Sequence, residues 1–314
     1  MSSLLTNSAA MTALQTLTST NKKMEVTQNR ISTGQRVSSA ADNAAYWSIA
    51  TTMRSDNKAL SAVQDALGLG AATVDVMYTA LNSTVEVVSE IKSKITAAAQ
   101  PGVDRGKIQS EITELQNQLN TIASSAVFNG ENWLSFDSTD AAASANREIV
   151  SSFTRTATGA VSLETTTVAI TGTLLVDTNA AAAGILDQDR SGAFALAGTS
   201  VTGTSVVDLD VNAAAADANI AADMQQLIGL VDAALSDITD AATNLGAIKN
   251  RIGLQQDFVK GLKDSIDRGV GQLVDADMNA ESTRLQALQV QQQLGIQALS
   301  IANSNSQNIL SLFR

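Results

Sequence analysis

The sequence predicts a mainly α-helical protein with a small β-containing insert near its middle. Apolar residues recur at alternating spacings of three and four over residues 60–95, and again over residues 220–273. This heptad pattern is typical of helices that pack side by side at a shallow angle. Between about 137 and 217 the chain becomes rich in Thr, Val and Gly, a composition that favours short strands and turns. We therefore expect long helices from both termini to form a coiled-coil rod, α+β overall because of the insert.

The first heptad seam is nearly unbroken. Its positions are Leu60, Val63, Leu67, Gly70, Val74, Met77, Leu81, Thr84, Val88, Ile91 and Ile95. Pro101-Gly102 should end this helix, because proline cannot continue a helix and glycine suits a C-cap. A shorter helix is predicted over residues 108–122. Asn129-Gly130 then predicts a tight turn, since both residues tolerate positive φ.

The second seam continues from Ile220 to Leu273, with Gln255 and Gly269 as its lapses. Both chain ends carry weaker seams that include polar residues, which cost stability but fix register and partner choice. The predicted positions are Leu14, Leu17, Asn21, Met24, Gln28 and Ile31 near the N-terminus, and Leu285, Leu288, Gln292, Gly295, Leu299, Ala302, Ser306, Ile309 and Phe313 near the C-terminus. The stretch RVSSAADNAAYWSIA, residues 36–50, interrupts the pattern without a core stripe.

The insert should contain strands in two segments, TGAVSLETTTVAITGTLLV (158–176) and FALAGTSVTGTSVVDLDV (194–211). Both are partly alternating and β-branched. Elsewhere, the glycines of LGLGAA (67–72) lie inside a helical seam rather than after a strand. They therefore indicate close helix contact and not a dinucleotide-binding loop.

Composition excludes several classes of function. The 314 residues include no Cys and no His, so thiol catalysis, imidazole catalysis and the usual zinc sites are absent. A net charge of −11 argues against nucleic acid and anionic membranes as partners. No stretch of about 18 apolar residues predicts a membrane span, and the N-terminus does not resemble an ordinary secretory signal. We expect neither an enzyme nor a bound cofactor.

DADMNAE, residues 275–281, is the best metal candidate, because its acids alternate as in a calcium loop. Ala280, however, stands where such a loop needs glycine, and Gln286 stands where the closing glutamate belongs. A turn between two helices is the preferred interpretation. Two classes of function then remain: a self-assembling structural protein whose terminal helices pack against neighbours, or a helical adaptor that binds another partner. Fibres formed by the protein alone would identify the first.

Several separated motifs resemble bacterial flagellin, the subunit of the flagellar filament. They are NRISTGQRVSSAADNAAYWSIA (29–50), IQSEITELQNQLNTIASSAVFNG (108–130), NLGAIKNRI (244–252) and QNILSLFR (307–314). The resemblance covers nearly everything except residues 137–217. The hook–filament junction protein of the same superfamily is the alternative, although the QNILSLFR ending favours the filament subunit.

The resemblance implies four parts of the chain. Residues 1–32 and 285–314 would form an inner filament-core domain, and residues 33–45 and 271–284 the spoke segments that link it outward. Residues 46–136 and 218–270 would form an outer helical domain with a short β element. Residues 137–217 would form a surface-exposed variable domain, here small, so that the filament should be slim. The spoke explains why residues 36–50 lack a continuous seam.

The resemblance also implies roles for particular residues. Spoke residues would be Arg36, Asp42, Asp275 and Asp277. The polymerisation residues would be Leu4, Leu5, Met11, Leu14, Leu17, Leu299, Ile309, Leu310, Leu312 and Phe313, with the two terminal helices expected to pair only in the polymer. The implied partners are other copies of the chain, sibling flagellins, a filament cap, hook-junction proteins and an export chaperone. The implied location is outside the cell, after export through the flagellar type III apparatus.

One further implication concerns immune recognition. Flagellins sensed by the vertebrate Toll-like receptor for this protein carry Gln-Arg-Val-Arg-Glu-Leu in the outer helix. The equivalent residues here are 86–91, where Val87 and Ser89 replace the two arginines and Glu90 keeps the acid. Because arginine is over-represented among interface hot spots, we expect weak activation of that receptor.

Overall fold

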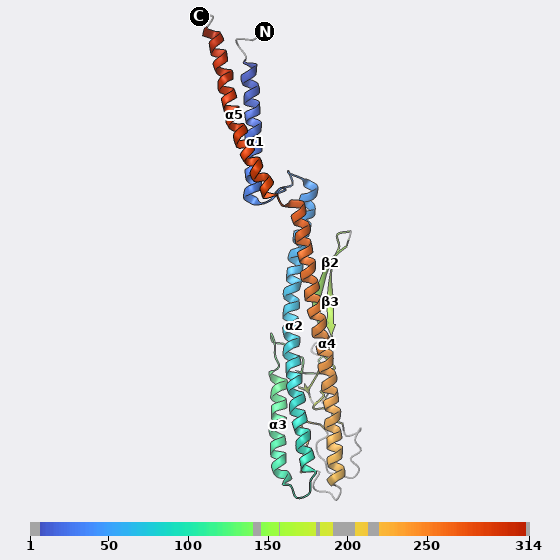
Figure 1. The fold of residues 1–314 in the computed structure, drawn as a ribbon. Coiled ribbons are helices and arrows are strands. Elements are labelled where there is room, and N and C mark those ends of the chain that lie inside the picture. The colour runs from blue at the N-terminus through green and yellow to red at the C-terminus, as the bar shows by residue number, and fades with distance from the viewer. Residues whose placement is uncertain are drawn as a thin grey trace. The chain divides into compact units, whose positions relative to one another are not determined.

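The computed structural model describes residues 7–140, 146–156, 158–179, 183–190, 205–212 and 220–311. Over these residues the helices are α1 (Ser8–Thr33), α2 (Ala44–Ala98), α3 (Arg105–Ser125), α4 (Ile220–Val274) and α5 (Met278–Ser311) (Figure 1). The described residues between α3 and α4 contain four strands. The prediction of a mainly helical chain with a small β-containing insert is therefore confirmed. The chain divides into two compact units, Met1–Lys58 with Leu262–Arg314, and Ala59–Gly261.

Within the Ala59–Gly261 unit, α2 and α4 run antiparallel. Lys249 Nζ lies 2.8 Å from Asp75 Oδ1, and Lys92 Nζ lies 2.5 Å from Asp232 Oδ1. Residue numbers therefore increase along α2 while those of the facing residues on α4 decrease. The seam predicted for α2 forms the core between the helices. Its buried apolar members, each no more than 3% exposed, are Leu60, Val63, Leu67, Val74, Met77, Leu81, Val88, Ile91 and Ile95.

The predicted helix ends are also confirmed. α2 ends at Ala98, three residues before Pro101. α3 then begins behind Asp104, whose carboxylate caps the helix by accepting a hydrogen bond from the Lys107 N–H. After α3, Asn129 and Gly130 adopt φ of 53° and 84°, which makes the tight turn predicted from their sequence.

The insert is built around a hairpin. β2 (Arg147–Arg155) pairs antiparallel with β3 (Val161–Val168), while β1 (Ser135–Phe136) pairs parallel with β4 (Val176–Asp177). The hairpin contacts α4 through its backbone, because Gln255 Nε2 donates to the Ser151 carbonyl at 2.9 Å. It contacts α2 at Gly70, where a Cβ atom would lie 2.5 Å from Ile149 Cγ2.

Gly70 corrects the interpretation of LGLGAA. The glycine does permit a close approach, but the neighbour is strand β2 rather than another helix. A Cβ on Gly68, two residues earlier, would meet nothing within 4 Å. The two glycines of one motif therefore lie in different environments, because a two-residue step turns a helix by ~200°.

The second predicted strand segment is also corrected. Residues 191–204 lie outside the described part of the chain, and residues 205–212 form bends and a turn instead of a strand. The backbone of this segment is hydrogen-bonded by a side chain of α3 rather than by a neighbouring strand. Gln116 Nε2 donates to the carbonyls of Val206 and Leu209, both at 3.0 Å. These glutamine bonds satisfy the buried carbonyls that a sheet would otherwise pair.

Candidate assembly surface on the terminal helices

α1 and α5 lie side by side and antiparallel in the single chain (Figure 1). Polar contacts between the two helices occur at three levels. Asn7 Nδ2 donates to the Ala302 carbonyl at 3.0 Å, and Gln292 Nε2 donates to Asn21 Oδ1 at 2.9 Å. Arg30 forms an ion pair with Glu281 at 3.1 Å. These contacts fix the register of the pair, because a slip along the axis would break all of them.

Glu281 is the most buried charge in this helix pair among the described residues, at 7% exposure. Arg30 and Arg284 both approach its Oε1 atom, at 3.1 and 3.4 Å. A buried carboxylate is stable only where cations or donors replace its lost water. The sequence placed Glu281 only among the acids of DADMNAE, although its position four residues before Leu285 continues the seam of α5.

The seam of α1 differs from the predicted one. Its buried residues are Thr20 and Thr27, whereas the predicted Asn21 and Gln28 are exposed. Thr20 satisfies its hydroxyl within the helix by donating to the Thr16 carbonyl at 3.0 Å, so its methyl group can face α5 without an unpaired donor. Leu17, Met24 and Ile31 are half-buried as predicted. The seam residues between them lie one position earlier than predicted, at Ala13, Thr20 and Thr27, and Leu14 therefore falls outside the seam.

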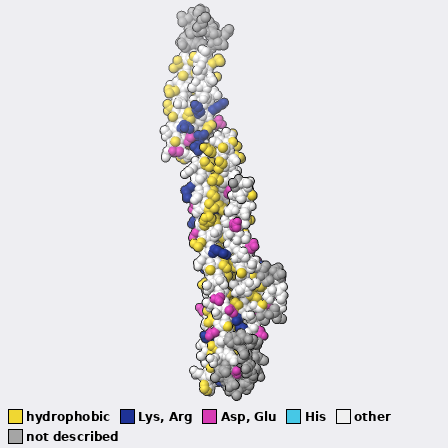
Figure 2. Space-filling model, turned by 90° about the vertical axis from the view of Figure 1, so that its right-hand side faces the viewer, with side chains coloured by type: hydrophobic (Ala, Val, Ile, Leu, Met, Phe, Trp, Pro, Cys, Tyr) yellow, Lys and Arg dark blue, Asp and Glu magenta, His cyan; other side chains and the backbone are white. Residues whose placement is uncertain are grey.

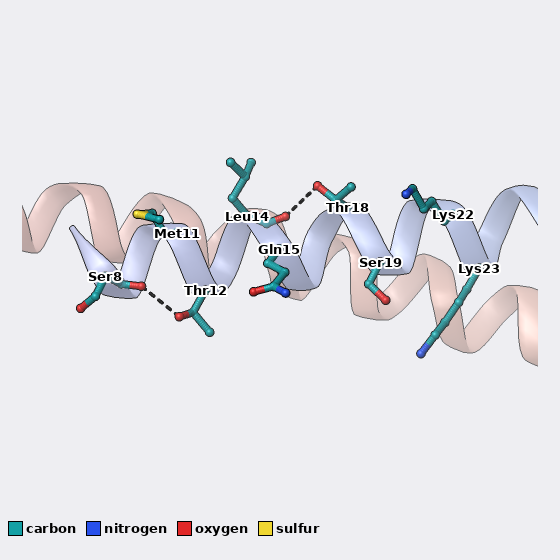
Figure 3. Close-up of a pocket in the computed structure, with 9 residues that line it drawn as sticks. All are labelled: Ser8, Met11, Thr12, Leu14, Gln15, Thr18, Ser19, Lys22 and Lys23. Atoms are coloured by element: carbon teal, nitrogen blue, oxygen red, sulfur yellow. Dashed lines mark hydrogen bonds between the residues drawn. The ribbon is translucent and has the colours of Figure 1, made fainter. Parts of the chain in front are cut away.

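Leu14 and Met11 are instead exposed, at 54% and 65%. In Figure 3 both project from the same edge of α1 as Thr18 and Lys22. They belong to a shallow groove of about 1050 Å³ along this helix. α5 carries its own exposed apolar residues, which are Val290, Leu294, Ile296 and Ile301, each at least 53% exposed. Exposed apolar side chains that lie close together, as Met11 and Leu14 do, mark an interaction surface.

The predicted polymerisation residues therefore differ in exposure. Met11 and Leu14 are exposed, whereas Leu17 and Leu299 are half-buried, and Leu17 lies against Gly295 on α5. Leu4, Leu5, Leu312 and Phe313 lie outside the described residues, as do the side chains of Ile309 and Leu310.

The structure pairs α1 with α5 within one chain through these polar contacts and through apolar residues such as Leu17 and Leu288. The expectation that this pair forms only in the polymer stays a prediction. The exposed Met11 and Leu14 are what remains for a neighbouring molecule to cover.

The segment between α1 and α2 is held by backbone bonds to the end of α4. Gly34 closes α1 in the left-handed region, with φ of 71°. Arg36 N and Val37 N both donate to the Val274 carbonyl, and Ala276 N donates back to the Gly34 carbonyl. Beneath these bonds, Val37 and Val274 pack in a small apolar core with Ala50 and Val270. The loss of the heptad pattern in this stretch therefore reflects pairing between the non-helical residues 34–37 and the end of α4 with the residues that follow it.

Each predicted spoke residue has a defined contact here. Arg36 also donates from its guanidinium to the Leu273 carbonyl at 3.0 Å, and Asp275 pairs with Gln35 in a β-bridge. Asp42 accepts hydrogen bonds from the backbone and hydroxyl groups of Ser39 and Ser38, which lower the pKa of its carboxyl below the usual 3.8.

Asp277 explains the spacing of acids in DADMNAE. Its Oδ1 accepts from the N–H groups of Asn279 and Ala280 at 2.9 and 3.2 Å, so it caps α5 as an Asp in that position commonly does. Among the described residues no group of acids is arranged to hold a metal ion. In the same part of the chain, no helix is long and apolar enough to cross a membrane.

The residues equivalent to the receptor motif are not equally accessible. Ser89 and Glu90 are exposed, whereas Val87 is only 7% exposed. An arginine at position 87 would have to enter the packed side of α2 or distort it, since an unpaired charge is costly to bury. Weak activation of the receptor stays a prediction, and a variant that tests it should change Ser89 alone.

Comparison with known proteins places the chain in a family. Residues 4–139 match the bacterial flagellin N-terminal helical region, and residues 228–313 match the bacterial flagellin C-terminal helical region. The chain is 52% identical to flagellin C of Rhizobium meliloti (strain 1021) and 48% identical to a flagellin of Brucella melitensis biotype 1, with the full length of both chains covered in each case.

Among solved structures, the crystal structure of Bacillus cereus flagellin is similar with a TM-score of 0.39 and 20% identity, covering 63% of this chain and 88% of that one. The sequence matches, which cover both helical ends and the whole length of the relatives, are decisive. The chain belongs to the bacterial flagellin family.

Proposed function

We propose that the chain is a structural subunit that polymerises with copies of itself into the extracellular flagellar filament. The observation that carries this proposal is the set of exposed apolar side chains on α1 and α5, which the pairing of these two helices leaves uncovered. Met11 and Leu14 have no cover in the single chain, at 65% and 54% exposure. A second copy of the chain would bury them, and burial of apolar area drives association.

The family favours this function over the two alternatives. The relatives that match over their whole length are named as flagellins, which supports a filament subunit rather than a hook–filament junction protein. A helical adaptor would need no set of exposed apolar residues on both terminal helices. Flagellins are structural proteins, and we therefore infer that this chain is a subunit without catalytic activity.

The finer partners belong to this proposal as well. A filament cap, hook-junction proteins, an export chaperone and sibling flagellins are expected because the chain belongs to the family. The same holds for export without a cleaved signal and for the inner, spoke, outer and variable parts at the boundaries given above. Support for an inner part comes from the antiparallel α1–α5 pair, and support for a spoke comes from the backbone bonds between residues 34–37 and 274–276.

Seeded polymerisation of the purified protein tests the function. The native chain should form filaments visible by electron microscopy, and a Met11→Glu, Leu14→Glu variant should not, because two charges would be buried at the contact. The matched control is Val103→Glu with Val127→Glu, which charges two exposed apolar residues, at 37% and 49%, beyond either end of α3. Filaments from the α1 variant at the native concentration would contradict the proposal.

Truncation provides an independent test. Deleting residues 307–314 should abolish polymerisation, because this apolar end is part of the C-terminal motif that the family shares. The helices of the Ala59–Gly261 unit should stay folded, since their core is complete without it. Circular dichroism on the truncated monomer checks the second expectation, and normal filaments from it would refute the first.

A further inference from the structure

Three exposed apolar residues of α5 form one row. Val290, Leu294 and Ile301 are each at least 55% exposed, and their spacings of four and seven keep them on one face of the helix. Each follows by two residues a buried or half-buried residue of the inner seam, and these are Leu288, Gln292 and Leu299. Two residues turn a helix by ~200°, so the row faces away from α1. We call it the α5 outer row.

The groove of about 1050 Å³ on α1 has the matching position on its own helix. Met11, Gln15 and Thr18 line it, and Leu14 projects at its edge (Figure 3). Each of the three precedes by two residues a buried or half-buried seam residue, and these are Ala13, Leu17 and Thr20. The groove is therefore turned by ~200° from the seam side of α1. We call it the α1 outer groove.

The threonines of the outer groove can be covered without losing a hydrogen bond. Thr12 donates its hydroxyl to the Ser8 carbonyl at 2.9 Å, and Thr18 donates its hydroxyl to the Leu14 carbonyl at 2.8 Å, both drawn in Figure 3. Because these bonds lie within α1, an apolar side chain can pack on the threonine methyl groups and leave no donor unpaired.

Charge is absent from most of both outer faces. No Asp, Glu, Lys or Arg occurs in residues 1–21 or 285–313, and the lysines of the outer groove, Lys22 and Lys23, lie at one end of it. Figure 2 shows this on one face, where hydrophobic and uncharged side chains cover the upper part of the helix pair and Lys and Arg gather below them. Packing of these faces would therefore take few charges out of water, which is the costly part of burial.

The outer row and the outer groove lie on opposite sides of the α1–α5 pair, so the row cannot reach the groove of its own chain. A neighbour in the same orientation would present its α1 antiparallel to this α5, as the two helices lie within one chain. Inside the chain Leu17 lies against Gly295, and Asn21 accepts a hydrogen bond from Gln292. The same register between copies sets Ile301 level with Met11.

We propose that the α5 outer row of one copy packs in the α1 outer groove of the next copy, with Ile301 opposite Met11 and Leu294 opposite Thr18. This inference rests on the proposed function and deepens it, because it names the two faces that meet. The contact joins unlike faces of identical chains, and such a head-to-tail contact can repeat from copy to copy. Contact between two α1 helices, or between two α5 helices, would instead close after two copies.

Cysteine cross-linking distinguishes these arrangements, because the chain contains no Cys. Met11→Cys and Ile301→Cys are made as separate variants, and both side chains are exposed in the single chain. Filaments copolymerised from the two variants and treated with a short bismaleimide should yield linked dimers. Filaments of either variant alone should yield none. Dimers from Met11→Cys alone would show that two α1 helices meet, and would overturn the proposal.

The control pairs Met11→Cys with Ile296→Cys. Ile296 is on the same helix and is 53% exposed, but it follows Leu294 by two residues and so lies ~200° from the outer row. This mixture should give no dimers. Dimers at the level of the Ile301 mixture would mean that the outer row is not the face in contact.

Growth from native seeds provides a second measurement. Leu294→Asp should slow growth about tenfold, because it places a charge in an apolar contact, and Ile296→Asp should slow it much less. Circular dichroism of the monomers checks that both variants keep their helices. Equal loss in the two variants, or mixed filaments without dimers, would overturn the contact between the outer row and the outer groove alone. A native chain that never polymerises would instead overturn the proposed function.

Discussion

Two helices with the same heptad spacing differ in what they bury. Along α2 the seam from Leu60 to Ile95 is apolar apart from Gly70 and Thr84, and all of it is buried. Along α1 the buried residues are Thr20 and Thr27, while Met11 and Leu14 face outward. The α2 seam is therefore completed inside the chain. The α1 surface is left for other copies.

The contrast teaches how one chain can be stable alone and still polymerise. Apolar burial is extensive in the Ala59–Gly261 unit. The α1–α5 pair buries less apolar surface, with Leu288 buried and Leu17 and Leu299 half-buried, and polar contacts such as Arg30–Glu281 set its register. A terminal pair with a full leucine seam would hold its apolar residues inside. It would then have little left to drive assembly.

The largest expected difference comes from equal truncations in the two helices. Leu67→Ala in the α2 seam should lower the free energy of unfolding by about 2–5 kcal/mol, because it empties a fully buried site. Leu14→Ala on α1 should change it by less than about 0.5 kcal/mol, yet slow polymerisation. Urea unfolding and seeded growth measure the two effects. Equal destabilisation by both variants would show that Leu14 is part of the monomer core.

A second test uses two glycines of one motif. Gly70→Ala forces a Cβ to within 2.5 Å of Ile149 Cγ2 and should cost about 1–3 kcal/mol through overpacking of the hairpin against α2. Gly68→Ala meets open space and should stabilise the helix by about 0.5–1 kcal/mol. Thermal unfolding of both variants gives the comparison. Two shifts of the same sign would mean that the hairpin does not pack on Gly70.

Sequence periodicity predicted the long helices because each apolar seam residue independently indicates the same helical spacing. Nine apolar positions on α2 agree with one another, so no single residue decides the result. The α5 seam was also placed correctly, since Leu285, Leu288 and Leu299 are buried or half-buried. On α1 every second position of the predicted seam was one residue too late, while Leu17, Met24 and Ile31 were placed correctly. Threonine carries both a methyl and a hydroxyl, and hydrophobicity alone ranked Thr20 and Thr27 below Leu14.

Other features depend on residues distant in sequence, and no local pattern contains them. Gln116 is an ordinary polar helix residue until its amide is seen bonding to Val206 and Leu209, about 90 positions later. The bonds that hold Arg36 and Val37 to Val274 join backbone atoms, which have no sequence signature. The resemblance to a family predicted that residues 33–45 and 271–284 form a spoke. The hydrogen bonds that hold these residues together could be identified only from the structure.

A third test uses acid, because the α2 seam contains no titratable group and the linker does. The Ser39 and Ser38 hydrogen bonds lower the pKa of Asp42 below 3.8. A group with a lowered folded pKa stabilises the fold above its unfolded pKa, and this contribution is lost as pH falls through the folded value. Amide protection at Ser38 and Ser39 should therefore fall below about pH 3.8, before that of α2 is lost.

Hydrogen exchange across this pH range measures the effect, with Asp42→Asn as the control. The variant should have weakly protected Ser38 and Ser39 amides already at neutral pH, with no further loss on acidification. Protection that stays unchanged in the native chain down to pH 2 would show that the carboxylate does not hold the linker.

The smallest expected effect is that of salt on assembly. α1 and α5 contain four basic residues (Lys22, Lys23, Arg30 and Arg284) and two acidic ones (Glu25 and Glu281), so of the net charge of −11 the rest of the chain carries −13. Repulsion between copies therefore arises outside the terminal helices. Raising salt through about 0.1 M, where the Debye length is near 10 Å, should screen it and speed growth severalfold. Growth rates between about 0.02 and 0.3 M sodium chloride measure the effect, and slower growth at higher salt would place opposite charges, rather than like ones, at the main contacts.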